Sequence, residues 1–194
     1  MEISAQHIAT APRAAYVGEA FRQMAAAWDD PLSGEGARIQ GGRFNPPESF
    51  PVLYLCTTRA CAVAELRNRG QRLAIGVEGL LPRAVYRYEV SLDRIVDLTS
   101  RETLDHVGVT IPQIVGADLI VPRQIGEAAH ATGFQAIRAP SATGIDAILA
   151  VFPELIASVR LVHIFSNSGL RSATCEAPGT YFCTSHPSEA TVWS

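Results

Sequence analysis

Two arginines and a pair of glycines have the types and the spacing to bind a phosphorylated ligand. Arg43 directly follows Gly41 and Gly42, and Arg22 precedes this glycine-rich stretch. Glycines let backbone amides approach a ligand closely, and a guanidinium offers a planar fork of donors, so the pair suits a pyrophosphate better than a single carboxylate. The alternative is an ordinary turn at the glycines, with Arg43 as a solvated loop residue.

Glu65 is the only acidic residue of residues 59–69, a segment that we expect to be helical. A carboxylate among so many small apolar neighbours is a candidate for the wall of a cleft. The competing interpretation is an i,i+4 ion pair with Arg69 on a solvated helix face, which contributes only about 0.2 to 0.5 kcal/mol. The residues alone leave both interpretations open.

Tyr54 and Ser141 are weaker candidates. Tyr54 stands between two leucines in an expected strand, residues 52–56, so its side chain points to the opposite sheet face from theirs. Its ring could stack on a flat heteroaromatic group, or it is a core tyrosine with a satisfied hydroxyl. Ser141 follows Pro140 at the end of an expected strand, where a turn or cap residue is the ordinary interpretation.

Several classes of site and partner are not supported by the sequence. The five histidines show no metal-ligand spacing, no serine or cysteine stands in a nucleophile-elbow pattern, and no G-x-G-x-x-G motif follows a strand. The formal net charge is -3 and the 16 basic residues are scattered, which disfavours nucleic acid as the primary partner. We expect no membrane-crossing segment.

The four cysteines do not form C-x-x-C pairs. Cys56 and Cys61 lie in an apolar strand and helix, and we expect both to be buried free thiols in a reducing cytosol.

The sequence signals for the helices, strands and loops that must position these residues differ in strength. An alanine-rich stretch, residues 16–27, is a candidate helix, and residues 29–49 contain so many glycines and prolines that we expect a long loop. Thr58 is a plausible N-cap for the helix over residues 59–69, which Gly70 can stop. Further strands are expected at residues 86–90, 94–98, 135–138, 145–152 and 159–165, and further helices at residues 101–107 and 123–132.

Strands and helices are mixed without strict alternation, which favours an α+β fold with a largely antiparallel sheet and surrounding helices over a doubly wound sheet. The length suits one domain, which we place at residues 1–165 with its core at residues 21–165. Residues 166–194 are rich in Ser, Thr, Pro and Gly, and we expect a partly disordered polar tail.

Taken together, the motifs resemble those of the RES-domain toxins. The order and spacing match over roughly residues 21–165, and such a run of matches is more specific than any single motif. The matching stretches are DPLSGEGAR (30–38), GGRFNPP (41–47), PVLYL (51–55), the helix with Glu65, VDLT (96–99), QIGEAA (124–129), GF (133–134) and PS (140–141).

The resemblance implies a cytoplasmic bacterial toxin of a toxin–antitoxin pair, with an ADP-ribosyltransferase-like fold and no metal. Such a toxin consumes NAD by hydrolysis, by phosphorolysis with inorganic phosphate, or by transfer of ADP-ribose. The family's functional positions fall on Arg22, Arg43, Tyr54, Glu65 and Ser141. The implied partner is an Xre-like antitoxin that blocks the pocket and itself makes any DNA contact.

Two residues depart from the family pattern. Gln23 follows Arg22 where some relatives have an aromatic residue, which weakens any expectation of stacking near Arg22. Asp146 stands where Asn is expected after the serine.

The chemistry implied by the resemblance is cleavage of the bond between nicotinamide and ribose, which produces an oxocarbenium-like centre. Arg22 and Arg43 would hold the pyrophosphate, Tyr54 would position the nicotinamide or its ribose, and Glu65 would stabilise the developing cation. Ser141 would orient Glu65 or the ribose. Two alternatives are a mono-ADP-ribosyltransferase that modifies one cellular protein and a catalytically silent module that binds the antitoxin.

Overall fold

The structure is a computed structural model that describes residues 3–27 and 30–156, and the backbone of residues 160–165. The predicted tail at residues 166–194 lies outside the described residues. The helices are α1 (Ala5–Ala9), α2 (Glu35–Gln40), α3 (Arg59–Arg72), α4 (Arg101–Val107), α5 (Ile111–Val115) and α6 (Ile120–Ala131), with short 3₁₀ turns η1 (Glu78–Leu80) and η2 (Pro153–Leu155). The strands are β1 (Arg13–Ala25), β2 (Leu53–Cys56), β3 (Arg83–Asp97), β4 (Ala136–Pro140), β5 (Ala147–Val151) and β6 (Arg160–Phe165).

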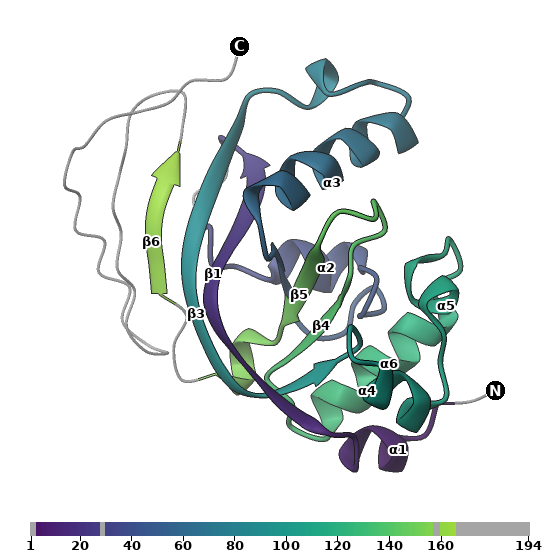
Figure 1. The fold of residues 1–194 in the computed structure, drawn as a ribbon. Coiled ribbons are helices and arrows are strands. Elements are labelled where there is room, and N and C mark those ends of the chain that lie inside the picture. The colour runs from purple at the N-terminus through teal and green to yellow at the C-terminus, as the bar shows by residue number, and fades with distance from the viewer. Residues whose placement is uncertain (1–2, 28–29, 157–159, 166–194) are drawn as a thin grey trace.

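The strands form one sheet in the order β1-β2-β5-β4-β3-β6, and β1 also pairs with β3. Five strands are therefore joined in a ring of hydrogen-bonded pairs, with β6 on the outer edge of β3. Only the β3–β4 pair is parallel, so the expectation of a largely antiparallel α+β fold is confirmed. Figure 1 shows β1 and β3 as two long, curved strands side by side, with α3 beside their upper part and α1, α4, α5 and α6 grouped toward their lower ends.

The expected helix over residues 16–27 is wrong, because this stretch belongs to strand β1. β1 pairs with β3 from Arg13 to Ala25, apart from a bulge near Ala14. Alanine favours a helix by less than 1 kcal/mol per residue, and a paired strand of this length overrides that preference. Tyr16, Val17 and Phe21 also favour a pleated surface.

The two strands expected at residues 86–90 and 94–98 form one continuous strand, β3. Ser91 and Leu92, which separate the two apolar runs, remain paired with Val17 and Tyr16 of β1. The Gln135 side chain also accepts hydrogen bonds from two backbone amides where β3 bends toward β4. The polar residues between the runs are therefore the solvent side of a long strand rather than a turn.

The long loop expected at residues 29–49 contains a short helix, α2. Gly34 caps the start of this helix, and Gly41 ends it with φ 73°, a left-handed conformation that favours glycine. An ion pair of 2.7 Å between Arg38 and Glu35 spans the helix surface. The glycines thus bound the helix instead of preventing it.

Helix α3 starts after Thr58, as predicted, and its Thr58 side chain accepts a hydrogen bond from the Cys61 amide. The helix does not end at Gly70 but continues to Arg72. Gly70 is buried against the backbone of Gly76, where the returning chain leaves no room for a Cβ. This glycine therefore serves a close approach of two backbones rather than a helix stop.

The remaining predicted elements agree well with the structure. The helix at residues 101–107 is found with the predicted bounds, and α6 begins three residues before the predicted start. The strands expected at residues 135–138, 145–152 and 159–165 are found as β4, β5 and β6 with small shifts of their ends. Within the described part of the chain, no helix has both the length and the apolar character to cross a membrane.

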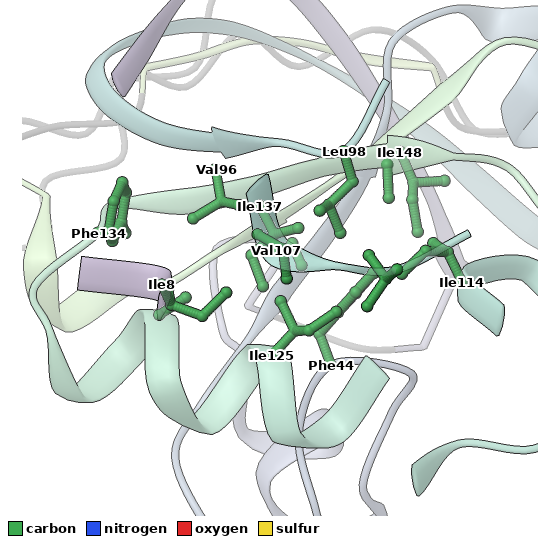
Figure 2. Packing of buried hydrophobic residues seen from close by; sticks show 14 of the residues in the cluster. Ile8, Phe44, Val96, Leu98, Val107, Ile114, Ile125, Phe134, Ile137 and Ile148 are labelled. Atoms are coloured by element: carbon green, nitrogen blue, oxygen red, sulfur yellow. The ribbon is translucent and has the colours of Figure 1, made fainter. Parts of the chain in front are cut away.

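Buried residues form two clusters, one on each face of the sheet. Figure 2 shows the cluster on the helical side, in which Ile8 of α1 and Ile125 of α6 pack with strand residues such as Val96 and Ile137. The other cluster contains Leu53 and Leu55 of β2. Tyr54 packs on the helical cluster, so the predicted alternation of side chains along β2 is confirmed.

The chain segment around Phe44 is anchored in the helical cluster. Phe44 has no exposed surface, and its backbone carbonyl lies directly on Gly126 of α6, where a Cβ would overlap it. Figure 2 shows the Phe44 ring beside Ile125 and Ile114. A buried aromatic side chain and a glycine contact thereby fix the position of the preceding residue, Arg43.

Candidate functional site

A cavity of about 700 Å³ opens between the ends of β1 and β2, the glycine-rich segment after α2, and helix α3. Its lining is dominated by one kind of charge. Six arginines line it, together with a single carboxylate, Glu65. The arginines are Arg22, Arg43, Arg69, Arg72, Arg83 and Arg123. Among the described residues, none of the six takes part in an ion pair. A cavity with this charge balance suits a ligand with several negative charges.

Arg43 is held at the cavity by the end of α5. Its Nη1 atom donates hydrogen bonds of 2.8 Å to the backbone carbonyls of Ile114 and Gly116. Burial lowers the pKa of Arg43 from its ordinary value, while the nearby charge of Glu65 acts in the opposite direction. Arginine stays protonated at physiological pH despite such a shift, so the site keeps a fixed positive charge here.

Position 42, directly before Arg43, must be a glycine because the Tyr54 side chain lies too close for a Cβ. A Cβ at Gly42 would lie 2.5 Å from the Tyr54 hydroxyl oxygen. The Gly42 amide donates to the Asn45 carbonyl at 2.9 Å, which closes a tight turn around Arg43. The two glycines therefore form a shaped turn that presents Arg43 to the cavity.

The Tyr54 hydroxyl is occupied inside the protein. It accepts a hydrogen bond of 2.8 Å from the Phe44 amide and donates one of 2.9 Å to Asn45 Oδ1. Asn45 is fully buried and its Nδ2 donates to the Ala37 carbonyl at 2.6 Å. Burial strongly raises the pKa of Tyr54, so the hydroxyl stays protonated. Tyr54 thus lines the cavity with its ring while its hydroxyl ties the Arg43 segment to β2.

Arg22 is positioned by strand β1 and by the segment before α2. Its Nη1 atom donates hydrogen bonds of 3.0 Å to the carbonyls of Pro31 and Ser33. The same Pro31 carbonyl accepts a hydrogen bond from the Tyr88 hydroxyl at 2.7 Å. Arg22 therefore enters the same cavity as Arg43 from a different element, and both lie within it as lining residues.

The Glu65 side chain extends from α3 into the cavity and accepts a hydrogen bond from Ser141, which lies on the protein side of the carboxylate. The Ser141 hydroxyl donates to Glu65 Oε1 at 2.7 Å. Ser141 is 2% exposed and does not line the cavity, so it contacts Glu65 from the protein side. Thr143 supports it, because its amide donates to Ser141 Oγ at 3.1 Å. The alternative ion pair between Glu65 and Arg69 is not formed.

The turn after β4 explains why Ser141 lies there. Gly144 and Asp146 both have a positive φ, 73° and 57°, which Gly and Asp accept more readily than most residues. The Asp146 carbonyl accepts from the Ser141 amide at 3.0 Å, and its carboxylate accepts from the Thr57 hydroxyl at 3.1 Å. The departure at Asp146 therefore keeps a residue type that suits the left-handed conformation.

Sequence reasoning did not single out four of the cavity arginines, or Gln23 as a cavity residue. Arg69 and Arg72 follow Glu65 at i+4 and i+7, a spacing that places all three on one face of α3. That periodicity was the available signal. Gln23 also lines the cavity, and its buried side-chain oxygen has no hydrogen-bond partner among the described residues.

The described residues contain no group of three or more His, Cys, Asp or Glu side chains that could hold a metal ion. Cys56 and Cys61 are buried free thiols, as predicted, and Cys56 contributes to the cavity wall. A hydrogen bond with Cys61, followed by burial, raises the pKa of the Cys56 thiol, so this thiol is not an activated nucleophile.

A mixed helix and strand domain has a cavity lined by arginines and by one carboxylate that a buried serine holds, which defines a pocket for an anionic ligand. The chain belongs to the RES domain family, whose sequence profile matches residues 13–167. The predicted family resemblance is thereby confirmed.

Relatives of known activity are similar to this chain. The NAD(+) phosphorylases MbcT of Mycobacterium bovis and Mycobacterium tuberculosis are 31% identical over 127 residues, which cover 64% of this chain and 68% of theirs. A solved structure with the same arrangement is the crystal structure of the M. tuberculosis MbcT–MbcA toxin–antitoxin complex. It matches with a TM-score of 0.73 and 27% identity, over 84% of this chain and 90% of that chain.

Proposed function

We propose that this protein is an NAD-degrading toxin that breaks the bond between nicotinamide and ribose, with inorganic phosphate as the acceptor. The proposal includes an ADP-ribosyltransferase-like arrangement of the sheet. The observation that carries it is the Glu65 carboxylate, held by Ser141 in a cavity otherwise lined with arginines. The name of the MbcT relatives, NAD(+) phosphorylase, supports phosphate as the acceptor.

Arg22 and Arg43 bind the pyrophosphate of NAD in this proposal. Each guanidinium is fixed by two backbone carbonyls through Nη1 alone. Arg22 also interacts with the Tyr88 hydroxyl, but each guanidinium has five N–H donors, so both arginines keep donors for phosphate oxygens. Because both arginines are already ordered, little side-chain entropy is lost when the ligand binds.

Glu65 acts at the nicotinamide ribose. One of its oxygens accepts from Ser141, and the other is available to accept from a ribose hydroxyl and to stabilise the positive charge that develops at the anomeric carbon. The nicotinamide nitrogen is positive in NAD and takes the bonding electron pair when it leaves as a neutral molecule. The reaction therefore needs no general acid at the leaving group.

Tyr54 and Ser141 are positioning residues in this mechanism. The Tyr54 hydroxyl holds the Phe44 amide, next to Arg43, so only its ring is available to pack against the nicotinamide or its ribose. Ser141 fixes the carboxylate orientation of Glu65 from the protein side.

The partner that we propose is an antitoxin, of the Xre-like class, that covers the cavity. Support comes from the solved complex, in which MbcT is bound to the antitoxin MbcA. A cytoplasmic location follows from the location of NAD and of such a partner. The proposal assigns no role to a metal ion.

The test mixes the purified chain with NAD and measures released nicotinamide, with and without inorganic phosphate. We expect ADP-ribose 1″-phosphate as the product and a loss of at least a hundredfold in kcat for Glu65→Gln. Glu127→Gln is the matched control, because Glu127 is exposed on α6 and outside the cavity. Unchanged turnover in Glu65→Gln, with folding verified by circular dichroism, contradicts the proposal. ADP-ribose as the product would indicate water as the acceptor. In a second assay with labelled NAD and a cell lysate, a labelled protein would indicate a protein acceptor.

A further inference from the structure

The cavity holds more positive charge than NAD requires. NAD has two negative charges on its pyrophosphate, and Arg22 and Arg43 are sufficient to pair with them. Four more arginines line the cavity. Arg123 donates to the Gly42 carbonyl, and the other three are Arg69 and Arg72 on α3 and Arg83 at the start of β3. None of the three forms an ion pair with another described residue.

Arg83 is separated from Arg22, one member of the pyrophosphate pair, along the paired strands β1 and β3. In the β1–β3 ladder Arg22 is opposite Tyr86, while Arg83 is opposite Ala25. Arg83 is therefore three residues further along the strands, roughly 10 Å away at the rise of a strand. Arg83 can thus contact a different anion from the one that Arg22 binds.

Two of these arginines, Arg69 and Arg72, follow Glu65 along one face of α3. At the rise of an α-helix, Arg69 is about 6 Å and Arg72 about 10 Å beyond Glu65 along the helix axis. Both are exposed at the mouth of the cavity, whereas Arg83 is half-buried and anchored by its Nε donating to the Leu80 carbonyl at 2.9 Å. An anion bound here lies within reach of the ribose that Glu65 contacts.

Unpaired like charges in one wall repel each other until an anion binds. The neighbouring charge of Arg69 contributes to lowering the pKa of Arg83, after burial, and Arg72 acts in the same direction on Arg43. The ordinary alternative for Arg69 and Arg72 is a favourable interaction with the carbonyl end of α3, which needs neither side chain in the cavity. Their place in the cavity wall favours a ligand.

We propose that Arg69, Arg72 and Arg83 form a second anion site that binds a phosphate group, separate from the pyrophosphate site. This inference rests on the proposed function for its role in the reaction. Two sources share this chemistry: inorganic phosphate as the acceptor, or the 2′-phosphate of NADP as part of the substrate. With inorganic phosphate, a phosphate oxygen forms a bond to the anomeric carbon as the bond to nicotinamide breaks. The electron pair leaves with nicotinamide, and the proton of hydrogen phosphate stays on the new ester.

The test is a titration of the full chain with inorganic phosphate, followed by calorimetry or ³¹P NMR. We compare the wild type with the double variant Arg69→Gln and Arg72→Gln, because glutamine keeps the helix propensity while it removes the charge. Arg67→Gln is the control, since Arg67 is exposed on α3 and outside the cavity. We expect the Kd for phosphate to rise at least tenfold in the double variant and to stay unchanged in the control. Lysine at both positions should restore part of the affinity.

Kinetics then distinguish the two sources. If inorganic phosphate is the ligand, the KM for phosphate rises at least tenfold in the double variant while the KM for NAD changes less than twofold. If the 2′-phosphate is the ligand, the variant loses a preference for NADP over NAD in phosphate-free buffer, and the site is supported with that source. The proposal is overturned if the double variant binds phosphate as the wild type does and keeps the same preference between NADP and NAD. It is also overturned if the double variant shows only a higher KM for NAD.

The binding titration stays informative if the enzyme has no activity. Wild-type protein that binds phosphate but releases no nicotinamide contradicts the proposed function and leaves the anion site supported. Wild-type protein that cleaves NAD but shows the same phosphate affinity and NADP preference as the double variant contradicts the anion site alone. Far-ultraviolet circular dichroism and thermal unfolding of each variant exclude loss of folding as the cause.

Discussion

The Ser141 hydroxyl donates a 2.7 Å hydrogen bond to Glu65, across a sequence separation of 76 residues. The donor comes from the turn after β4 and the acceptor from the middle of α3, so the contact exists only when the sheet and the helix are assembled. Ser141 is buried and the Glu65 side chain faces the cavity. The serine therefore acts on the ligand through the carboxylate.

Replacing Ser141 with alanine should lower kcat by roughly tenfold to a hundredfold and change the KM for NAD much less. A hydrogen bond to a charged group contributes about 1.5 to 3 kcal/mol, and here the carboxylate loses orientation rather than the ligand losing a contact. Steady-state kinetics of nicotinamide release measure both constants. Ser91→Ala is the control because Ser91 is exposed on β3. A rise in KM with constant kcat would contradict the positioning role.

Replacing Arg43 with lysine should raise the KM for NAD by about tenfold or more, although the charge is kept. The Arg43 guanidinium bridges the carbonyls of Ile114 and Gly116 and still has donors for a ligand, and a single ammonium cannot reproduce this planar arrangement. Arg38→Lys, on the exposed surface of α2, is the matched control. Equal KM values for Arg43→Lys and the wild type would remove Arg43 from the pyrophosphate site.

Replacing Gly126 with alanine should destabilise the protein by about 1 to 3 kcal/mol and also weaken NAD binding. A Cβ at Gly126 overlaps the Phe44 carbonyl, and overpacking in a close-packed core forces the backbone to move. That backbone leads directly to Arg43, so stability and affinity should fall together. Urea unfolding and NAD titration measure the two effects, with Glu127→Ala as the exposed neighbour. A stable variant with wild-type affinity would show that the loop is not fixed by this contact.

The free energy of unfolding should decrease as pH rises above about 10, the ordinary tyrosine pKa. Burial raises the pKa of Tyr54 and Tyr88 in the folded chain, so above this pH the unfolded chain loses protons that the folded chain retains. Below pH 10 the contribution of each such tyrosine to the free energy of unfolding is fully present. Above pH 10 each one lowers the free energy of unfolding by up to about 1.4 kcal/mol per pH unit. The sequence contains no lysine, so ammonium groups of side chains do not complicate this range.

Urea unfolding at pH 8, 10 and 11 tests this dependence. Tyr88→Phe and Tyr54→Phe should each flatten the decrease, and Tyr54→Phe should also lower stability at pH 8 because the Phe44 amide loses its acceptor. Ser91→Ala should leave the slope unchanged. A slope that is the same in all variants would mean that other groups control alkaline unfolding.

Local sequence patterns predicted those elements whose signals come from neighbouring residues. Helix α4, the start of α3 at Thr58 and the alternation along β2 were all predicted correctly, because caps and periodicity act within a few residues. The helix expected at residues 16–27 was wrong because the pairing of β1 with β3 involves partners about seventy residues away. Local alanine propensity is weak against such a ladder.

The glycines also divide into those required by the local backbone conformation and those required by contacts with distant parts of the chain. Gly41 ends α2, and its left-handed φ requires glycine for a local reason. Gly70 and Gly126 are required instead by backbones that approach from elsewhere in the chain. Nothing in the residues beside them indicates which backbone that is.

By itself, the sequence determined the charge and chemistry available to this protein: two arginines around a glycine turn, one carboxylate among small apolar neighbours, and a motif order typical of the RES domain family. Only the tertiary structure decided how these groups are used. It places Ser141 behind Glu65, occupies the Tyr54 hydroxyl with the Phe44 amide, and adds four further arginines to the cavity wall. The physical reason is that hydrogen bonds and charge interactions act over a few ångströms in space, a distance that spacing along the chain does not specify.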